Sequence, residues 1–379
     1  MDMPRRMFLT GNRAIALAAL DSGLGFYAGY PITPSSDLME YIAVELPRRG
    51  GVFIQAEDEL ASINMVIGAS IAGAKSMTAT SGPGYSLMQE GIGLAVMLEV
   101  PIVVVDITRL GPATGQATKA GQGDLMQARW GRHGDQYTAV FSAATVRDAY
   151  DITIHAFNVA ESLRVPVTLL IDELTGHLWE TVELPDAPTI VDRVWTDRDG
   201  EFFHSDNPSI PPPMPKLGVG LNVLYTGSTH DGRGFRKTQD AEIHSRLVRR
   251  LRDKVFRNID KIFRFNVYPM DGDSVDIVFI SYGSVSRSAM EATRILIDKG
   301  YRAKSIDLNT LWPMDYNLLR RLVEDSTIII VPELCLGQLI YDVKMIAGGD
   351  RVYGYNKVGG GIPIYPSELV EYVGRVMAR

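Results

Sequence analysis

The stretches GFYAGYPITPSS, at residues 25–36, and KSMTATSGPG, at residues 75–84, share one pattern. Each begins with a short strand-like run and ends in a turn rich in Pro or Gly, after which a helix is expected. The same alternation runs through the first half of the chain, with further strands predicted at residues 51–55, 101–106 and 166–171 and helices at residues 11–23 and 58–73. Short apolar strands that alternate with helices predict an α/β fold whose parallel sheet is covered on both faces.

This alternation stops near residue 185 and returns near residue 275. The intervening residues include a proline-rich loop at 208–215 and a predicted helix crowded with basic residues at 246–254. Strands are predicted again at residues 275–280, 301–306 and 327–331. We therefore expect two doubly wound α/β domains, residues 1–185 and 273–379, joined by an irregular connecting segment, residues 186–272.

Composition excludes several classes of function. The chain has 379 residues and a net charge of −7, which argues against a broad nucleic-acid-binding surface. No apolar run approaches the roughly 20 residues needed to span a bilayer. Cys335 is the single cysteine, so this chain alone cannot hold a disulfide framework, a cysteine-based zinc site or an iron–sulfur cluster. The six His show no metal-ligand spacing, so no metal site is predicted. A single cysteine fits a reducing compartment, and a cytoplasmic location is expected.

The N-terminus resembles a twin-arginine export signal, because Arg5 and Arg6 precede the apolar residues 14–20. Asn12 and Arg13 interrupt any hydrophobic region, and no convincing cleavage site follows. We therefore interpret the stretch as a folded amphipathic helix.

Four loops follow predicted strands of the first domain: residues 30–36, 56–59, 80–84 and 108–124. The carboxyl ends of parallel strands meet at one edge of a sheet, where α/β proteins bind ligands. The sequence therefore predicts that these loops share a functional site.

Three of these loops carry candidate residues, each with a structural alternative. The acidic run Glu57-Asp58-Glu59 could stabilise a helix N-terminus, but the following helix is rich in small residues, so one carboxylate is expected to be partly buried and functional. Residues 81–84, SGPG, could cradle an anion or form a simple tight turn. Arg109 could be a surface arginine or a planar donor for a carboxylate ligand.

One further motif, Asp271-Gly272-Asp273-Ser274, is superficially like a metal–diphosphate motif. It stands before a predicted strand rather than after one, so we interpret it as a turn.

Five motifs occur in the order found in one known family: YPITPSS at residues 30–36, EDELASINM at 57–65, TATSGPG at 78–84, RLGPATG at 109–115 and QGDLMQARWG at 122–131. Together they resemble the alpha subunits of the 2-oxoacid:ferredoxin oxidoreductases, most of all the 2-oxoglutarate branch. The motifs cover residues 11 to about 180, and YTGSTHD at residues 225–231 extends the likeness.

The resemblance implies a thiamine-diphosphate enzyme assembled from several subunits. Its first domain would be like a thiamine pyrimidine-binding domain and its last like a transketolase C-terminal domain. The implied reaction is oxidative decarboxylation of a 2-oxoacid, here 2-oxoglutarate, with coenzyme A to acyl-CoA, CO2 and reduced ferredoxin.

The resemblance also implies roles for individual residues. Glu59, with Glu57 as the alternative, matches the glutamate that hydrogen-bonds the aminopyrimidine ring. Thr33 matches a threonine near the substrate carboxylate and the cofactor, although a helix-capping hydroxyl is its structural alternative. Arg109 matches the arginine that pairs with the substrate carboxylate. Ile32, Ser81 and Gly82 complete the implied cofactor-binding set, and the basic candidates for the distal substrate carboxylate are Lys119, Arg129, Arg132 and His133.

Other parts of such an enzyme are expected on partner chains. No copy of the family's GDG…N segment is found here, so the diphosphate and its Mg²⁺ are expected on a beta subunit, and the [4Fe-4S] clusters are also expected on partner chains. The chain begins at the pyrimidine domain, so a separate gamma subunit is expected, with a cluster-bearing delta subunit as a further candidate partner.

Three alternatives stay open from the sequence. The same chemistry could act on pyruvate or a branched-chain 2-oxoacid. The chain could be a non-catalytic assembly subunit of such a complex. A nucleotide-binding Rossmann protein is the more distant alternative, because no phosphate fingerprint follows the first strand.

Overall fold

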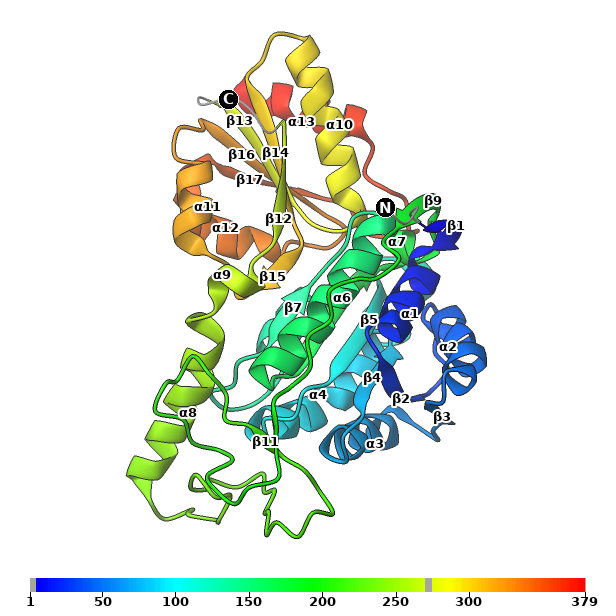
Figure 1. Ribbon diagram of the computed structural model, residues 1–379. Helices are drawn as coiled ribbons and strands as arrows, with labels where there is room; N and C mark the ends of the chain where they lie inside the picture. The colour runs from blue at the N-terminus through cyan, green and yellow to red at the C-terminus, as the bar shows by residue number, and fades with distance from the viewer. Residues whose placement is uncertain (1–4, 270–274, 379) are drawn as a thin grey trace.

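The computed structural model describes residues 5–269 and 275–378, and it contains two large sheets, each covered by helices (Figure 1). The predicted α/β fold with two doubly wound domains is confirmed. The motif at residues 271–274, interpreted above as a turn, lies outside the described residues.

The first sheet is parallel across its centre and has the strand order β15-β7-β8-β5-β4-β2-β3. Its edge strand β15 runs antiparallel to β7, and β6 pairs antiparallel with the end of β5. The strands are β2 (Leu24–Gly29), β3 (Val52–Gln55), β4 (Lys75–Thr80), β5 (Val103–Leu110), β6 (Gln116–Ala120), β7 (Ala139–Phe141), β8 (Val167–Asp172) and β15 (Thr310–Trp312).

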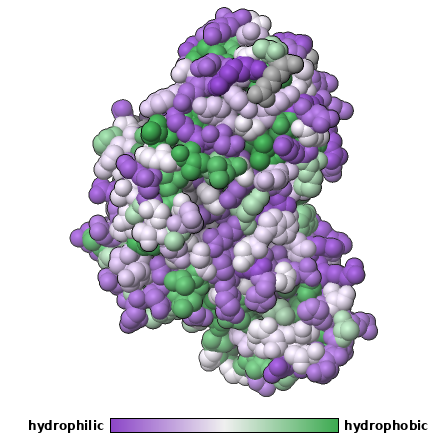
Figure 2. Space-filling model, turned by 180° about the vertical axis from the view of Figure 1, so that it is seen from behind, coloured by the Kyte–Doolittle hydropathy of each residue, from purple (hydrophilic) through white to green (hydrophobic). Residues whose placement is uncertain are grey.

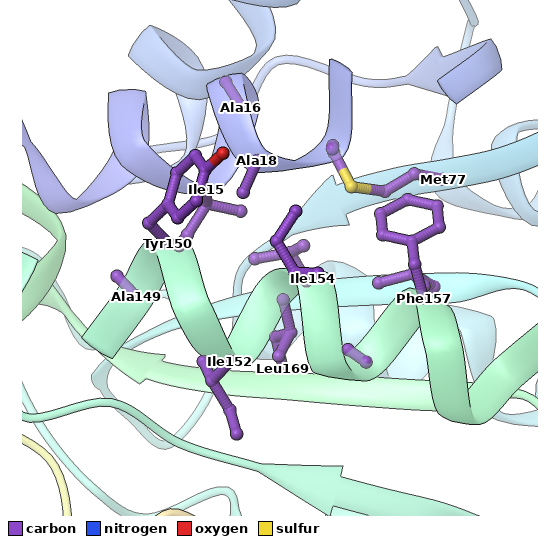
Figure 3. Packing of buried hydrophobic residues seen from close by; sticks show 14 of the residues in the cluster. Ile15, Ala16, Ala18, Met77, Ala149, Tyr150, Ile152, Ile154, Phe157 and Leu169 are labelled. Atoms are coloured by element: carbon purple, nitrogen blue, oxygen red, sulfur yellow. The ribbon is translucent and has the colours of Figure 1, made fainter. Parts of the chain in front are cut away.

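Helices cover both faces of this sheet. One face packs against α1 (Gly11–Asp21), α2 (Ser36–Arg48) and α6 (Val146–Leu163), and the other packs against α3 (Glu59–Ile71), α4 (Gly82–Met97) and α5 (Leu125–Trp130). Figure 3 shows the first of these layers, where Ile15 and Ala18 of α1 lie against Tyr150 and Ile154 of α6, above the sheet. Such burial on both faces explains why the strands read as continuous apolar runs.

The amphipathic helix expected at the N-terminus is wrong in two respects. Residues Arg5–Thr10 form a strand, β1, which pairs antiparallel with β9 (Trp179–Leu184). The helix begins only at Gly11, where Thr10 caps it by accepting a hydrogen bond from the backbone N–H of Arg13. The helix lies between α2 and α6, and its residues 14–20 are all apolar and buried, so it has no solvent-facing polar side over this run.

The second sheet has the order β12-β14-β13-β16-β17 and is parallel except for β12. Its strands are β12 (Phe265–Tyr268), β13 (Ile277–Ser281), β14 (Ala303–Leu308), β16 (Ile328–Glu333) and β17 (Val352–Asn356). Helices α10 (Ser284–Asp298) and α13 (Pro366–Met377) cover one face, and α11 (Tyr316–Leu322) and α12 (Leu339–Ala347) cover the other.

The segment between the sheets is sparse in regular structure. It contains β10 (Trp195–Thr196), β11 (Met214–Pro215), the long helix α8 (Ala241–Phe256) and the short helix α9 (Ile259–Ile262). Two further short elements lie outside this segment: α7 (Glu173–His177) precedes β9, and a 3-10 turn (Gly349–Arg351) precedes β17. The predicted domain boundaries, at residues 185 and 272, stay a prediction. Among residues 5–269 and 275–378, no helix is both long and apolar enough to cross a membrane.

Candidate functional site

The four loops singled out in the sequence follow β2, β3, β4 and β5, which are neighbouring parallel strands. Their carboxyl ends therefore lie along one edge of the sheet, as the sequence predicts. Side-chain contacts tie the loops to one another: Arg109 reaches Thr33, and the carboxyl group of Glu59 lies against Gly84.

Glu59 is the buried member of the acidic run. It is the first residue of α3 and is 5% exposed, whereas Glu57 is exposed. Asp58 serves as the N-cap instead, since its carboxylate accepts a hydrogen bond of 2.7 Å from the N–H of Ala61. Burial, together with the neighbouring charge of Asp58, raises the pKa of Glu59. A buried carboxyl group in this position can hydrogen-bond a ring nitrogen.

Gly84 makes room for the Glu59 carboxyl group. A Cβ atom at position 84 would collide with the Glu59 carboxylate and with the hydroxyl of Thr80, the last residue of β4. The glycine therefore lets the carboxyl group approach the backbone at the first turn of α4.

The SGPG segment forms a tight connection between β4 and α4. Ser81 is the N-cap residue and is fully buried, but its hydroxyl has no hydrogen-bond partner among the described residues. Gly82 is the first residue of α4, and Pro83 follows at a position where a helix has no need of a backbone N–H. The turn presents a free hydroxyl and the amino end of a helix beside Glu59, which is a polar setting for a ligand.

Arg109 and Thr33 meet across the sheet edge. The Nη1 atom of Arg109 donates a hydrogen bond of 2.6 Å to the carbonyl oxygen of Thr33, and Arg109 is only 7% exposed. Thr33 itself is exposed and Ile32 is half-buried. The capping position of α2 belongs to Ser35, whose hydroxyl donates to the carbonyl oxygen of Ile32 instead of accepting from the helix. A buried guanidinium held in this way can present its remaining donors to a carboxylate.

Two acidic residues near Arg109 were missed by the sequence reasoning. Asp106 lies inside β5 and is fully buried, and Asp124 precedes α5. The only sequence signal for Asp106 is that it is an acidic residue in an otherwise apolar strand. Asp124 appears in the sequence analysis only as part of the motif QGDLMQARWG at residues 122–131.

A cavity of about 500 Å³ opens beside Arg109, and both large domains line it. Gly82, Arg109 and Asp124 line it from the first domain, and Cys335 and Gln338 line it from the second. The second domain therefore forms one wall of this cavity, which the sequence did not predict. Glu59, Thr33 and Ser81 are not among the residues that line it.

The basic candidates for a distal carboxylate are not among the residues that line this cavity. Arg129 forms an ion pair with Asp342 and lies over the ring of Trp312, and Arg132 is buried in hydrogen bonds with Gln89 and Gln136. Lys119 and His133 are exposed. Within the described residues, no group of three or more His, Cys, Asp and Glu side chains is placed to hold a metal ion.

Two family models match this chain. The model described as "Pyruvate flavodoxin/ferredoxin oxidoreductase, thiamine diP-bdg" matches residues 17–250, and the model described as "Transketolase, C-terminal domain" matches residues 269–336. The first covers more than half of the chain and includes every loop of the site.

Two curated relatives match over nearly their whole length. The 2-oxoglutarate synthase subunit KorA of Methanothermobacter marburgensis is 45% identical over 98% of this chain and 99% of the relative. The ketoisovalerate oxidoreductase subunit VorB of Methanothermobacter thermautotrophicus is 31% identical over 93% of each.

A solved structure gives the same fold. The 2-oxoglutarate:ferredoxin oxidoreductase from Magnetococcus marinus, with 2-oxoglutarate, coenzyme A and succinyl-CoA bound, superimposes with a TM-score of 0.92 at 34% identity. This chain is covered over 98% of its length and spans 65% of that one. The chain therefore belongs to the family of thiamine-diphosphate-binding 2-oxoacid:ferredoxin oxidoreductases, among the alpha-type subunits related to KorA.

Proposed function

We propose that this chain is the alpha subunit of a 2-oxoglutarate:ferredoxin oxidoreductase and contributes the pyrimidine-binding half of its thiamine site. The observation that carries the proposal is the buried Glu59 carboxyl group, seated against Gly84 at the amino end of α4 in a chain of this family. The relatives named for 2-oxoglutarate support the substrate.

The residues present fit an aminopyrimidine ring. Glu59 offers a carboxyl group whose pKa is raised by burial, and Ser81 offers a buried hydroxyl without a partner among the described residues. Thiamine diphosphate, when bound, supplies a carbon acid and an electron sink for decarboxylation. In this proposal Glu59 holds or donates a proton at the ring nitrogen, while Ile32, Ser81 and Gly82 contact the ring and exclude water.

Arg109 is the proposed partner of the substrate carboxylate. Its guanidinium is buried, fixed by the carbonyl oxygen of Thr33 and open to the cavity. In such a partly dry site an arginine attracts a carboxylate more strongly than in water, because charges are less screened there.

Partner chains belong to the same proposal. A beta subunit would hold the diphosphate, Mg²⁺ and a [4Fe-4S] cluster, and separate gamma and delta subunits, ferredoxin and coenzyme A would complete the system, with the cytoplasm as its expected compartment. Figure 2 shows apolar patches among polar side chains on one face of the molecule. Large apolar side chains stay exposed at the cavity rim, including Leu336 at 87% and Val358 at 53%, which supports contact with another chain.

The test of the assignment is Glu59→Ala in the assembled complex, with Glu57→Ala as the matched control. Loss of a positioned proton-transfer group is expected to lower the decarboxylation rate by about 10²–10⁴-fold. Glu57 is exposed on the same turn, so its removal is expected to leave the rate within about twofold, as surface substitutions usually do. The measurement is ferredoxin reduction with 2-oxoglutarate and coenzyme A, with co-purification of the partner chains as the check on assembly.

Two outcomes would contradict the proposal. Full activity of the Glu59 variant rejects its catalytic role, and thiamine contacts confined to other chains favour the alternative of an assembly subunit. The substrate is tested separately, by comparing rates on 2-oxoglutarate, pyruvate and 2-oxoisovalerate. A preference for 2-oxoisovalerate would move the chain toward the activity named for the VorB relative.

A further inference from the structure

A buried amide at the start of α1 has no part in the proposal above. Asn12, which interrupts the apolar N-terminal run in the sequence, is the second residue of α1 and is fully buried. Because α1 leads into β2, its amino end lies at the sheet edge where β2 ends and the loop of residues 30–36 begins. A buried amide is costly unless it is hydrogen-bonded, so the partners of Asn12 indicate its role.

The nitrogen of this amide faces two acceptors. The Nδ2 atom of Asn12 donates a hydrogen bond of 2.9 Å to the carbonyl oxygen of Pro34 and a second one to the carboxylate of Asp37, in the first turn of α2. Since a carbonyl oxygen can only accept, the nitrogen rather than the oxygen of the amide must face the loop. The Oδ1 atom lies against Gly176 of α7, where a Cβ would stand 2.9 Å from it. The amide therefore reaches the loop from behind.

Three consecutive carbonyl groups of this loop are each held by a side chain. The hydroxyl of Ser35 donates a hydrogen bond of 2.8 Å to the carbonyl oxygen of Ile32. Arg109 and Asn12 donate to the next two carbonyl oxygens, at 2.6 and 2.9 Å. The donors come from three places in the chain, namely the loop itself, β5 and α1. The path of the loop is therefore fixed by side chains, two of which come from other elements.

The bond between Arg109 and the Thr33 carbonyl makes the position of the loop matter for the substrate. Arg109 is 7% exposed and lines the cavity of about 500 Å³. Its Nε atom has no partner among the described residues, so the bond from Nη1 to Thr33 does most to set the direction of the guanidinium. Asn12 holds the adjoining carbonyl, that of Pro34. A displacement of this carbonyl would therefore move Thr33 and turn the remaining donors of Arg109.

We propose that Asn12 is a positioning residue for the 2-oxoacid: by holding the Pro34 carbonyl it fixes the Thr33 carbonyl, which sets the direction of Arg109 toward the substrate carboxylate. The inference rests on the proposed function, since it requires Arg109 to bind that carboxylate. Asn12 acts from behind the loop and through Arg109. The Ile32 carbonyl is held by Ser35 instead, so the cofactor contact proposed for Ile32 does not depend on Asn12.

Loss of the Asn12 amide is expected to weaken substrate binding more than it slows the chemical step. Arg109 would pair with the carboxylate both in the bound substrate and in the transition state, and the loss of such uniform binding raises KM. A misplacement of about 1 Å at a binding group can cost about a hundredfold. We therefore expect Asn12→Ala to raise the KM for 2-oxoglutarate by about ten- to hundredfold in the assembled complex, with kcat within about threefold of the wild type.

Two control variants separate this role from general support of the fold. Asp37→Ala removes only the other hydrogen bond of Asn12 and leaves the donation to Pro34 in place. Asn258→Ala removes an amide that is also buried and also donates to two carbonyl oxygens, both in the connecting segment. All three variants are expected to lower the Tm, by roughly 2–6 °C. The two controls are expected to keep the KM within about twofold of the wild type.

Hydrogen exchange gives a readout that does not depend on turnover. Measured by mass spectrometry on the assembled complex, Asn12→Ala is expected to increase exchange in peptides that cover residues 30–36. Asn258→Ala is expected to leave these peptides at the wild-type rate. Should the alanine variant not assemble, Asn12→Asp replaces it, since aspartate at pH 8 has nearly the same shape and lacks the N–H donors.

The outcomes that overturn the inference are distinct from those that reject the proposed function. A KM within twofold of the wild type in the Asn12 variant, an equal rise of KM in Asp37→Ala, or unchanged exchange at residues 30–36 overturns the role of Asn12. Each of these leaves the proposed function standing, because the wild-type complex still turns over 2-oxoglutarate. A wild-type complex that turns over no 2-oxoacid rejects the proposed function and this inference together.

Discussion

At the scale of single residues, the position of Glu59 depends on a glycine that faces it. Glu59 is useful because it is buried, and it can be buried there because Gly84 has no side chain. The neighbouring Glu57, identical in chemistry, stays exposed two positions earlier. The difference between a solvated carboxylate and a buried one therefore comes from the backbone that it faces.

Gly84→Ala tests this dependence. A new Cβ would collide with the Glu59 carboxylate and the Thr80 hydroxyl, so we expect displacement of Glu59, loss of most activity and a decrease in the free energy of unfolding of about 1–3 kcal/mol. Gly93→Ala, in the same helix, is the control, since no described atom lies within 4 Å of its Cβ position. That change is expected to raise the free energy of unfolding by about 0.5–1 kcal/mol, measured by urea denaturation. Wild-type activity in the Gly84 variant would contradict the close approach.

At the scale of elements, α8 shows how a surface-like sequence becomes buried. Its sequence is crowded with basic residues, yet Arg250 and Lys254 are buried and both form ion pairs with Glu99, just beyond the end of α4. Arg164 joins the same cluster, donating hydrogen bonds to the carbonyl oxygens of Glu99, Phe202 and Pro212. This cluster fastens the irregular segment to the first domain.

Glu99→Gln is expected to loosen α8. The change leaves two buried cations, Arg250 and Lys254, without their negative partner, which costs about 3–5 kcal/mol when a buried pair is broken in this way. Arg252→Gln removes an exposed pair with Asp253 on the same helix and is expected to cost less than about 1 kcal/mol. Thermal unfolding gives the stabilities, and hydrogen exchange at residues 241–256 locates the effect. Equal losses in the two variants would show that the cluster does not hold the helix.

Acidification is expected to act on the same cluster. Burial alone would raise the pKa of Glu99, but Arg250 and Lys254 hold it well below its ordinary value. A carboxyl group with a lowered pKa stabilises the folded protein above its unfolded-state pKa, and this stabilisation is lost as pH falls through the folded-state value. Exchange protection of α8 is therefore expected to persist at pH 5 and to fail only below the ordinary titration range of glutamate.

At the scale of the whole molecule, the two large domains share an apolar cluster and several polar contacts. The apolar cluster contains Ile63 and Tyr85 of the first domain together with Ile280 and Ile329 of the second. Gln122 is a buried polar contact: its side chain donates to the Tyr282 carbonyl oxygen and accepts from the N–H of Leu334, both at 3.0 Å. Since Asp124 is two residues away, the second domain helps to position the loop beside Arg109.

Gln122→Ala is expected to loosen this junction. Buried partner groups lose their hydrogen bonds at a cost of about 1–3 kcal/mol each, and the KM for the 2-oxoacid is expected to rise as the Asp124 loop moves. Gln116→Ala is the control, because Gln116 is exposed and accepts a bond from the N–H of Gly360. Steady-state kinetics of the assembled complex and thermal unfolding compare the two. A KM unchanged in the Gln122 variant would show that the loop does not depend on the second domain.

Much of the fold could be predicted from the sequence because its strands are short, apolar and separated by clear turn signals. The strand predicted at residues 75–80 is β4 without change, and the turn after it leads into α4. The N-terminal strand β1 was missed, because it pairs with β9 from residues far along the chain. Pairing over such a distance leaves no local pattern to read.

The sequence by itself determined the α/β class, the sheet edge where the site lies and the family, because strand period, turn residues and motif order are local properties of the chain. Only the tertiary structure decided that Glu59 rather than Glu57 is buried, that Asp124 lines the same cavity as Arg109 and that the second domain lines this cavity too. Burial and the electrostatics that follow from it depend on contacts between segments far apart in the chain. The burial and the pKa of a side chain therefore depend on neighbours that are distant in the sequence.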